Sequence, residues 1–273
     1  MKILFVLSQT EVTGAETYAL ALAAALRDRG HELVLVSDTL KSAGGFKFHP
    51  VPVHGNNESY FGKFKSILAL KDILRSEKIE LIHSHSRAAN LACHFASRSL
   101  GGPAVPMVAT VHGRWRNTFA FRRLPCLGRA AIAVCPYLQR YLVEDIGIPR
   151  DRVRMVPNGI DTVAFSPPSF ERDGSPELLF VGRFSGQKGN VVRFLLKEVF
   201  GGIARKFPGL RIKLHAFSPS LQDKELVRKL NGDLKTEAAS IMESGEPSEV
   251  ANPSPNRSSR GIRALPIRRC PGP

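Results

Sequence analysis

Two cations stand in a glycine-rich segment of the second half of the chain. Arg183 follows a short apolar run, and Lys188 comes five positions later, with Gly182, Gly186 and Gly189 around them. Glycines let the backbone approach a ligand closely, and Arg and Lys side chains stabilise phosphate oxygens. An isolated R-x-x-x-x-K pattern is more typical of a solvated basic loop. The segment therefore indicates an anion site only together with its context.

A second anion-binding pattern lies near the amino terminus. Gly14 stands between the apolar segment 3–7 and a helical segment that begins at residue 15. Backbone N–H groups and the positive end of the helix would point at an anion there. The alternative is an ordinary strand-to-helix turn. The spacing does not fit G-x-G-x-x-G, so a nicotinamide cofactor gains little support.

Three histidines follow two short apolar segments. His83 and His85 come after residues 79–82, and His112 comes after residues 105–111. An H-x-H pair suggests a metal site, but the sequence offers no further ligands beside it, so we expect no metal. The chain also contains no D-x-D motif, which argues against a metal-held diphosphate. For His112 the alternative is a histidine satisfied within the core.

Composition narrows the class of protein. The 273 residues are 43% hydrophobic, which is enough for a large core, and the net charge of +15 predicts an anionic partner. No RNA-binding signature, zinc finger or helix-turn-helix accompanies the charge, so nucleic acid is not expected. The four cysteines form no C-x-x-C pair, which favours a reducing compartment. The apolar start is too short for a secretion signal, and no segment approaches the ~18 apolar residues of a membrane span.

Segments of strand and helix character alternate along the chain. The predicted strands are 3–7, 31–37, 79–82, 105–111, 130–134, 153–156, 177–181 and 210–214, and the predicted helices are 15–29, 64–78, 88–100, 136–145 and 191–207. Such alternation predicts a doubly wound α/β sheet, which binds its ligands at the carboxyl ends of the strands. Gly14, His85 and His112 all fall just beyond such ends.

The same patterns divide the chain into parts. We predict a Rossmann-like domain at 1–165, a Pro- and Ser-rich linker at 166–176, a partial second α/β domain at 177–234, and a disordered tail at 235–273. The fold class is therefore α/β, with two Rossmann-like doubly wound domains of which the second is incomplete.

Several segments, taken together, resemble the retaining glycosyltransferase family numbered four, which has the GT-B architecture. They are Thr13-Gly14-Ala15-Glu16 with Arg29-Gly30-His31-Glu32-Leu33, Ile82-His83-Ser84-His85-Ser86, Ala109-Thr110-Val111-His112-Gly113, Val156-Pro157-Asn158-Gly159-Ile160-Asp161, and Phe180-Val181-Gly182-Arg183 with Lys188-Gly189. Thr13 departs from the family pattern, which has a glycine at that position. The resemblance covers about residues 1–215, and the order and spacing of the segments make it specific.

The resemblance implies a role for each candidate residue. Arg183 and Lys188 would hold the diphosphate of a nucleotide-sugar donor, with Gly14 beside it. His112 would lie near the transferred sugar, while Glu16 and His85 would line the acceptor cleft. The donor would be a UDP- or GDP-sugar used as substrate, with no further cofactor. The acceptor would be a glycan or a lipid-linked saccharide, as in cell-envelope polysaccharide biosynthesis.

Basic and aromatic residues are interleaved at 114–123 and at 61–65. This composition suits an anionic membrane surface, and a solvated loop with a few core anchors fits it equally well. We therefore expect a cytoplasmic protein, or a peripheral protein on the inner face of the cytoplasmic membrane.

One family feature is not found in the last part of the sequence. The resemblance implies two glutamates eight positions apart that hold the donor, but Glu237, Glu243, Glu246 and Glu249 have no such partner. With the Ser-, Pro- and Arg-rich residues after 250, this predicts a truncated or frameshifted product that is a poor catalyst. The alternative is a non-catalytic remnant that binds an acceptor or a partner.

Overall fold

The structure is a computed structural model that divides into two compact units. It describes residues 1–7, 14–38, 45–53, 60–115, 123–163, 165–166, 177–184, 186–207, 209–217, 221–234 and 239–243. Unit 1 is Met1–Ile160 and unit 2 is Asp161–Pro273. The division falls five residues before the predicted end of the first domain, and most of the predicted linker lies outside the described residues. The same is true of the tail after residue 243.

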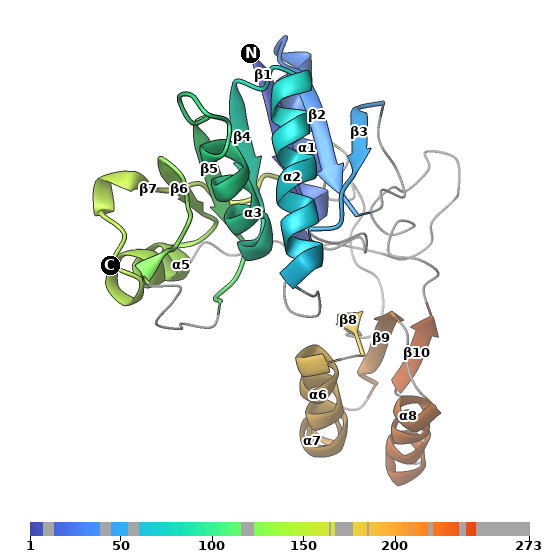
Figure 1. Cartoon of the computed structure of the whole chain (residues 1–273). Helices are drawn as coiled ribbons and strands as arrows, with labels where there is room; N and C mark the ends of the chain where they lie inside the picture. Colours follow the sequence, from blue (N-terminus) through green and yellow to red (C-terminus); the bar gives the residue numbers. More distant parts are fainter. Residues whose placement is uncertain are drawn as a thin grey trace. The chain divides into compact units, whose positions relative to one another are not determined.

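Unit 1 is built on a seven-stranded parallel sheet in the order β3-β2-β1-β4-β5-β6-β7 (Figure 1). Its strands are β1 Lys2–Val6, β2 Glu32–Ser37, β3 Lys47–Pro50, β4 Leu81–Ser84, β5 Met107–Val111, β6 Ala130–Ala133 and β7 Val153–Met155. Its helices are α1 Gly14–Asp28, α2 Tyr60–Ser76, α3 Arg87–Arg98 and α5 Pro136–Arg140, followed by a π-turn at Tyr141–Asp145 and a 3₁₀ turn at Arg150–Arg152.

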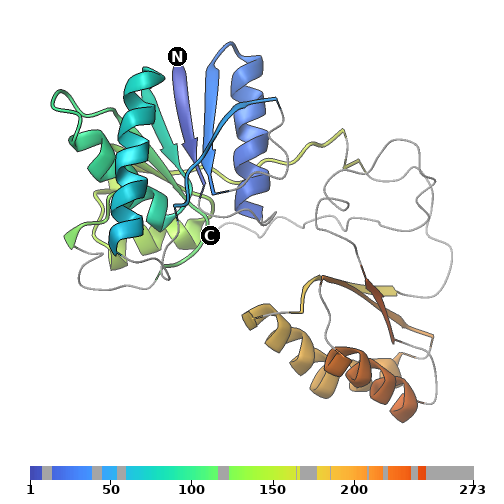
Figure 2. The same ribbon diagram turned by 45° about the vertical axis from the view of Figure 1, so that its right-hand side comes forward.

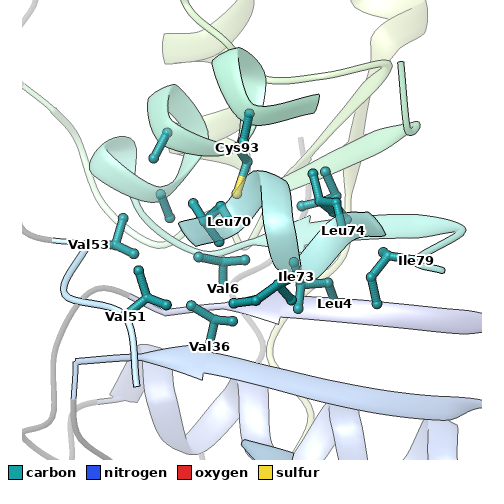
Figure 3. Packing of buried hydrophobic residues seen from close by; sticks show 14 of the residues in the cluster. Leu4, Val6, Val36, Val51, Val53, Leu70, Ile73, Leu74, Ile79 and Cys93 are labelled. Carbon is teal, nitrogen blue, oxygen red and sulfur yellow. The ribbon is translucent and has the colours of Figure 1, made fainter. Parts of the chain in front are cut away.

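Alternating side chains of the inner strands face helices on both sides of the sheet. Leu4 and Val6 of β1 pack against Leu70 and Leu74 of α2, as the close view in Figure 3 shows. The intervening residue Phe5 faces α1 instead. Figure 2 accordingly shows α1 and α2 on opposite sides of β1 and β2. A strand buried on both faces must be apolar throughout, which explains the unbroken run at the amino terminus.

Unit 2 is a three-stranded parallel sheet in the order β10-β9-β8, packed against helices. Its elements are β8 Glu177–Arg183, α6 Gly186–Phe194, a π-turn Leu195–Val199, α7 Phe200–Lys206, β9 Arg211–Phe217, α8 Leu221–Leu234 and β10 Ala239–Glu243. Val192, Leu196, Leu214 and Leu230 are among the apolar side chains that form its core. The α/β fold class is confirmed in both units.

Two elements of unit 2 correct the sequence analysis, which expected no helix after Leu214 and no structure after residue 234. Helix α8 has few apolar residues, but Val227 and Leu230 are buried in the core of unit 2. Strand β10 begins where the Asn231 side chain bonds both backbone groups of Ala239, at 2.7 and 2.9 Å. The Asn231 side chain thus fixes the start of β10, whose own sequence only weakly predicts a strand.

Candidate functional site

The sheet brings two of the predicted histidines to one edge. Strands β4 and β5 are parallel neighbours, paired His83 with Val108 and Ser84 with Ala109. His85 is the first residue after β4 and His112 is the first after β5. Their side chains therefore leave the carboxyl edge of the sheet side by side, as the sequence analysis expected for a ligand site.

The two imidazoles are hydrogen-bonded to each other. Nδ1 of His85 lies 3.2 Å from Nε2 of His112, and the rings stack with centroids 5.5 Å apart. Tyr18 of α1 meets the His112 ring edge-on at a centroid distance of 5.2 Å. The helix that begins at the predicted Gly14 site thus packs directly on the histidine pair.

A second layer of polar contacts lies beneath this pair. Nε2 of His83 is 2.8 Å from Oγ1 of Thr110, which also bonds the Tyr18 hydroxyl. The Phe5 ring lies 4.8 Å from the His83 ring and 5.3 Å from that of His85. The cluster is therefore held by the neighbouring strands β1, β4 and β5 and by α1. The sequence patterns place the three histidines at strand ends, but they predict neither the contacts among the three nor those with Phe5, Thr110 and Tyr18.

Burial keeps the three imidazoles uncharged at neutral pH. It lowers the pKa of His83 to about 4, with a smaller contribution from the nearby His112. Burial also lowers the pKa of His112 to about 4, and it places the pKa of His85 well below its ordinary value. A charged imidazole would lose its hydration here without gaining an anionic partner among the residues of the cluster.

Burial also indicates where the proton of the histidine pair lies. Nε2 of His85 is buried and has no hydrogen-bond partner. A buried N–H without an acceptor costs about 1–3 kcal/mol, so we assign the His85 proton to Nδ1, where it is donated to Nε2 of His112. The neutral His112 ring then carries its own proton on Nδ1. His112 can therefore donate one hydrogen bond to a ligand.

The two histidines of the H-x-H motif bond neighbouring side chains of the sheet. Among the described residues, no three His, Cys, Asp or Glu side chains are arranged to hold a metal ion. His83 and His85 point their ring nitrogens at Thr110 and His112 instead.

Gly14 and Glu16 lie at the start of α1, beside this edge of the sheet. A Cβ at Gly14 would meet no atom within 4 Å, so packing inside the protein does not require glycine there. Glu16 is half-buried in the first helical turn, where the helix dipole favours a negative charge. The assignment of Gly14 to a donor diphosphate and of Glu16 to an acceptor cleft stays a prediction.

The predicted diphosphate loop joins β8 to α6 in unit 2. Arg183 is the last residue of β8 and Lys188 lies in the first turn of α6, while both side chains lie outside the described part of the structure. A Cβ at Gly189 would stand 2.1 Å from the carbonyl oxygen of Phe184, so only glycine allows this close turn. The backbone is thus a strand, a tight loop and a helix amino terminus, which is a geometry that binds phosphate.

An ion pair that the sequence analysis missed supports this loop. The Arg193 guanidinium donates to the Phe184 carbonyl at 3.0 Å and to both carboxylate oxygens of Asp223, at 2.7 and 3.3 Å. Asp223 is fully buried at the start of α8. The loop backbone is therefore fixed by a residue about forty positions further along the chain, and no sequence spacing signals that contact.

In the basic and aromatic segment 114–123, the side chains of Arg114 and Trp115 make contacts within unit 1. Arg114 donates to Asp145 at 3.1 Å and to the Tyr137 hydroxyl at 3.2 Å. Trp115 packs on the core of β5 and β6, and its carbonyl accepts a hydrogen bond from Tyr141. These two residues fit the alternative of core anchors, and residues 116–122 lie outside the described part.

Known proteins share this fold and part of this sequence. A curated relative, the Escherichia coli UDP-Gal:alpha-D-GlcNAc-diphosphoundecaprenol alpha-1,3-galactosyltransferase, is 27% identical over 153 residues, which is 50% of this chain and 37% of that protein. A glycosyltransferase from Rickettsia africae has a TM-score of 0.70 at 15% identity, covering 92% of this chain and 69% of that one. Anabaena HepE, solved with UDP and glucose, has a TM-score of 0.64 at 15% identity, covering 89% and 69%.

The similar structures establish a shared GT-B fold, and the chain spans less than half the length of the curated relatives that it matches. The sequence profile of Glycosyltransferase Family 4 matches residues 12–164, more than half of the chain and nearly all of the histidine-bearing sheet. By this match the chain belongs to Glycosyltransferase Family 4.

Proposed function

We propose that this chain takes part in transferring a sugar from a UDP- or GDP-sugar to a glycan or lipid-linked acceptor, with retention of anomeric configuration. The observation that carries the proposal is the neutral His85–His112 pair at the carboxyl edge of the sheet. Family membership supplies the reaction class. The names of the relatives, a UDP-galactose enzyme with a lipid-linked acceptor and a protein solved with UDP and glucose, support this choice of donor and acceptor.

The neutral imidazole of His112 can orient a sugar by hydrogen bonding without placing a positive charge in the site. Its Nδ1–H donates a hydrogen bond to a sugar oxygen, while His85 holds the ring from the other side. An imidazole with a pKa near 4 is a weak general base at neutral pH. We therefore assign proton removal to the leaving group. As the anomeric C–O bond to phosphate breaks and the acceptor oxygen bonds the same carbon, a phosphate oxygen takes the acceptor's proton.

Arg183 and Lys188 supply the complementary charge in the proposal. The departing diphosphate gains negative charge as its bond to the sugar breaks, and two fixed cations stabilise that charge most in the transition state. The loop that carries them is held by Gly189 and by the Arg193–Asp223 ion pair. A loop fixed before the donor binds loses little entropy on binding.

Calorimetry with free UDP and GDP tests the donor site. Replacing Arg183 or Lys188 by Ala should weaken binding of the preferred nucleotide by about 1.5–3 kcal/mol, or about 10- to 150-fold. Lys197→Ala serves as the control, because Lys197 is an exposed cation of the same unit outside the loop. Unchanged nucleotide affinity in both loop variants would refute the assignment.

The aromatic residues at the start of α2 form an exposed surface that suits a membrane. Phe61, Phe64 and Leu68 share one helix face and are 66%, 56% and 42% exposed. The Lys65 ammonium lies 4.6 Å from the Phe61 ring centroid. Because α2 leads back to the amino end of β4, it begins at the carboxyl edge of the sheet (Figure 1). A lipid-linked acceptor would thus enter at the edge that carries His112.

Co-sedimentation with phosphatidylglycerol vesicles tests this surface. Binding should weaken as salt rises and should fall when Phe61 and Phe64 are both replaced by Ser. Phe95→Ser is the control, since Phe95 is an exposed aromatic, at 42%, on another helix, α3. Binding that is insensitive to salt and to the double substitution would leave α2 as ordinary surface.

A further inference from the structure

A cavity of unit 1 lies at the amino edge of the sheet, away from the histidine pair. It has a volume of about 520 Å³ and lies beside Met107 and Ala130, the first residues of β5 and β6. His112 follows the other end of β5, and five strand residues span roughly 16 Å. The cavity is therefore separate from the candidate site for sugar transfer.

The charged residues that line this cavity are of one sign. Arg98 comes from α3, Arg129 from the loop before β6, and Arg152 from the 3₁₀ turn before β7, while no Asp or Glu lines the cavity. The Arg152 guanidinium is bonded to the carbonyl oxygens of Gly128 and Arg129. Neither Arg98 nor Arg129 has a side-chain hydrogen bond or an ion pair within the described part of the chain. Two such guanidinium groups at one opening leave a positive field that an anion would neutralise.

The rest of the lining is largely apolar and includes Cys93, Pro103, Val105, Leu127 and Ile148. Cys93 and Leu127 are buried and belong to the two hydrophobic cores on either side of the cavity. A small inorganic anion would leave this surface in contact with water. The lining therefore favours a ligand with an apolar portion attached to its charge.

Both walls of the cavity are fixed before any ligand binds. The Ser97 hydroxyl donates to the Val105 carbonyl at 3.1 Å, which holds the segment before β5 against α3. On the other side, the backbone N–H of Arg129 donates to the Met107 carbonyl at 2.8 Å. Gly128 has φ +73°, and a Cβ there would lie 2.1 Å from the same carbonyl oxygen. The backbone that presents Arg129 is thus held in one conformation.

We propose that this cavity binds an amphipathic phosphate, with Arg98 and Arg129 holding the phosphate group and the apolar lining contacting the attached hydrocarbon chain. Charge of a single sign, an apolar interior and two fixed walls together distinguish it from a solvated crevice. Arginine matches phosphate oxygens bidentately, and two arginines on different elements can hold one group from two sides.

Calorimetry on the full chain tests the proposal, with decyl phosphate below its micelle concentration as the probe. UDP is present throughout, so that the proposed donor site does not contribute. We expect one decyl phosphate per chain, with at least tenfold weaker binding of inorganic phosphate and of decyl maltoside, which has the same chain without the charge. If inorganic phosphate binds as tightly as decyl phosphate, the apolar lining does not contribute to binding. If decyl maltoside binds as tightly as decyl phosphate, the site does not recognise the negative charge.

Substitutions in the cavity lining test whether decyl phosphate binds there. Arg98→Gln and Arg129→Gln should each weaken decyl phosphate binding about tenfold, whereas Arg140→Gln, an exposed arginine of α5 outside the lining, should not change it. Ala104→Trp should block the cavity, because Ala104 is an exposed part of its wall. Thermal unfolding confirms that each variant is folded. Wild-type affinity in both Arg98→Gln and Arg129→Gln would overturn the proposal, whatever the outcome at the donor loop.

Discussion

Mild acid should destabilise unit 1 through its buried histidines. His83 and His85 are almost fully buried, and burial lowers the pKa of each, to about 4 for His83 and well below the ordinary value for His85. In the unfolded chain both would titrate near pH 6.5. Between the two pKa values the unfolded state binds more protons than the folded state. Stability is therefore present at pH 7.5 and is lost as the pH falls below 6.5.

The size of the effect follows from this difference in proton binding. Lowering the pH from 7.5 to 5.5 favours the unfolded state by about 1.4 kcal/mol for each histidine that stays neutral when folded. His83 and His85 together should cost about 3 kcal/mol. For a unit of this size, that loss corresponds to a fall in melting temperature of about 6–12 °C. His112, whose pKa burial also lowers to about 4, would add a similar amount that the double variant below leaves in place.

Urea unfolding followed by circular dichroism at pH 7.5 and 5.5 measures this loss. Replacing His83 and His85 by Gln should lower stability at pH 7.5 but reduce its pH dependence by about 3 kcal/mol. Phe5→Leu is the control, since Phe5 contacts both rings and carries no proton. It should destabilise the unit equally at both pH values. An unchanged pH dependence in the double histidine variant would refute the reasoning.

Three further substitutions test individual contacts within the two units. Asp223→Ala should destabilise unit 2 by about 3–5 kcal/mol in urea unfolding, because Arg193 would lose its buried partner. Gly128→Ala should cost at least about 2 kcal/mol by the same measurement, since its Cβ would overlap the Met107 carbonyl at φ +73°. Glu77→Gln should destabilise unit 1 at pH 7, because Lys47 and other cations lower the Glu77 pKa to about 2; this difference should shrink as pH falls from 4.5 toward 2.

The strands of unit 1 were largely predictable because the inner strands are buried on both faces. Leu4 and Val34 lie in unbroken apolar runs, and both are fully buried. Strand β3, Lys47–Pro50, was missed because it lies at the edge of the sheet and is only half-buried. An edge strand tolerates lysine and proline, and a sequence with these residues resembles that of a loop.

The position of each site residue was easier to predict than its partners. His85 and His112 follow neighbouring strands, so the α/β pattern alone placed them at one edge of the sheet. Their mutual hydrogen bond depends on the strand order and on the packing of Tyr18, which no spacing reveals. The support of the diphosphate loop by Asp223 was missed for the same reason, since long-range polar contacts leave no periodic signal.

The place of β1 in the strand order has a consequence for how the chain folds during synthesis. β1 is an inner strand: Ile3 pairs with Leu33 on one side and with Leu81 on the other. Leu81 is synthesised 78 residues after Ile3, its partner in β1. At about 5–20 residues per second, one edge of this largely apolar strand remains unpaired for roughly 4–16 s. During that interval the unpaired edge of β1 is open to mispairing, and it is a binding site for a chaperone that recognises extended apolar peptides.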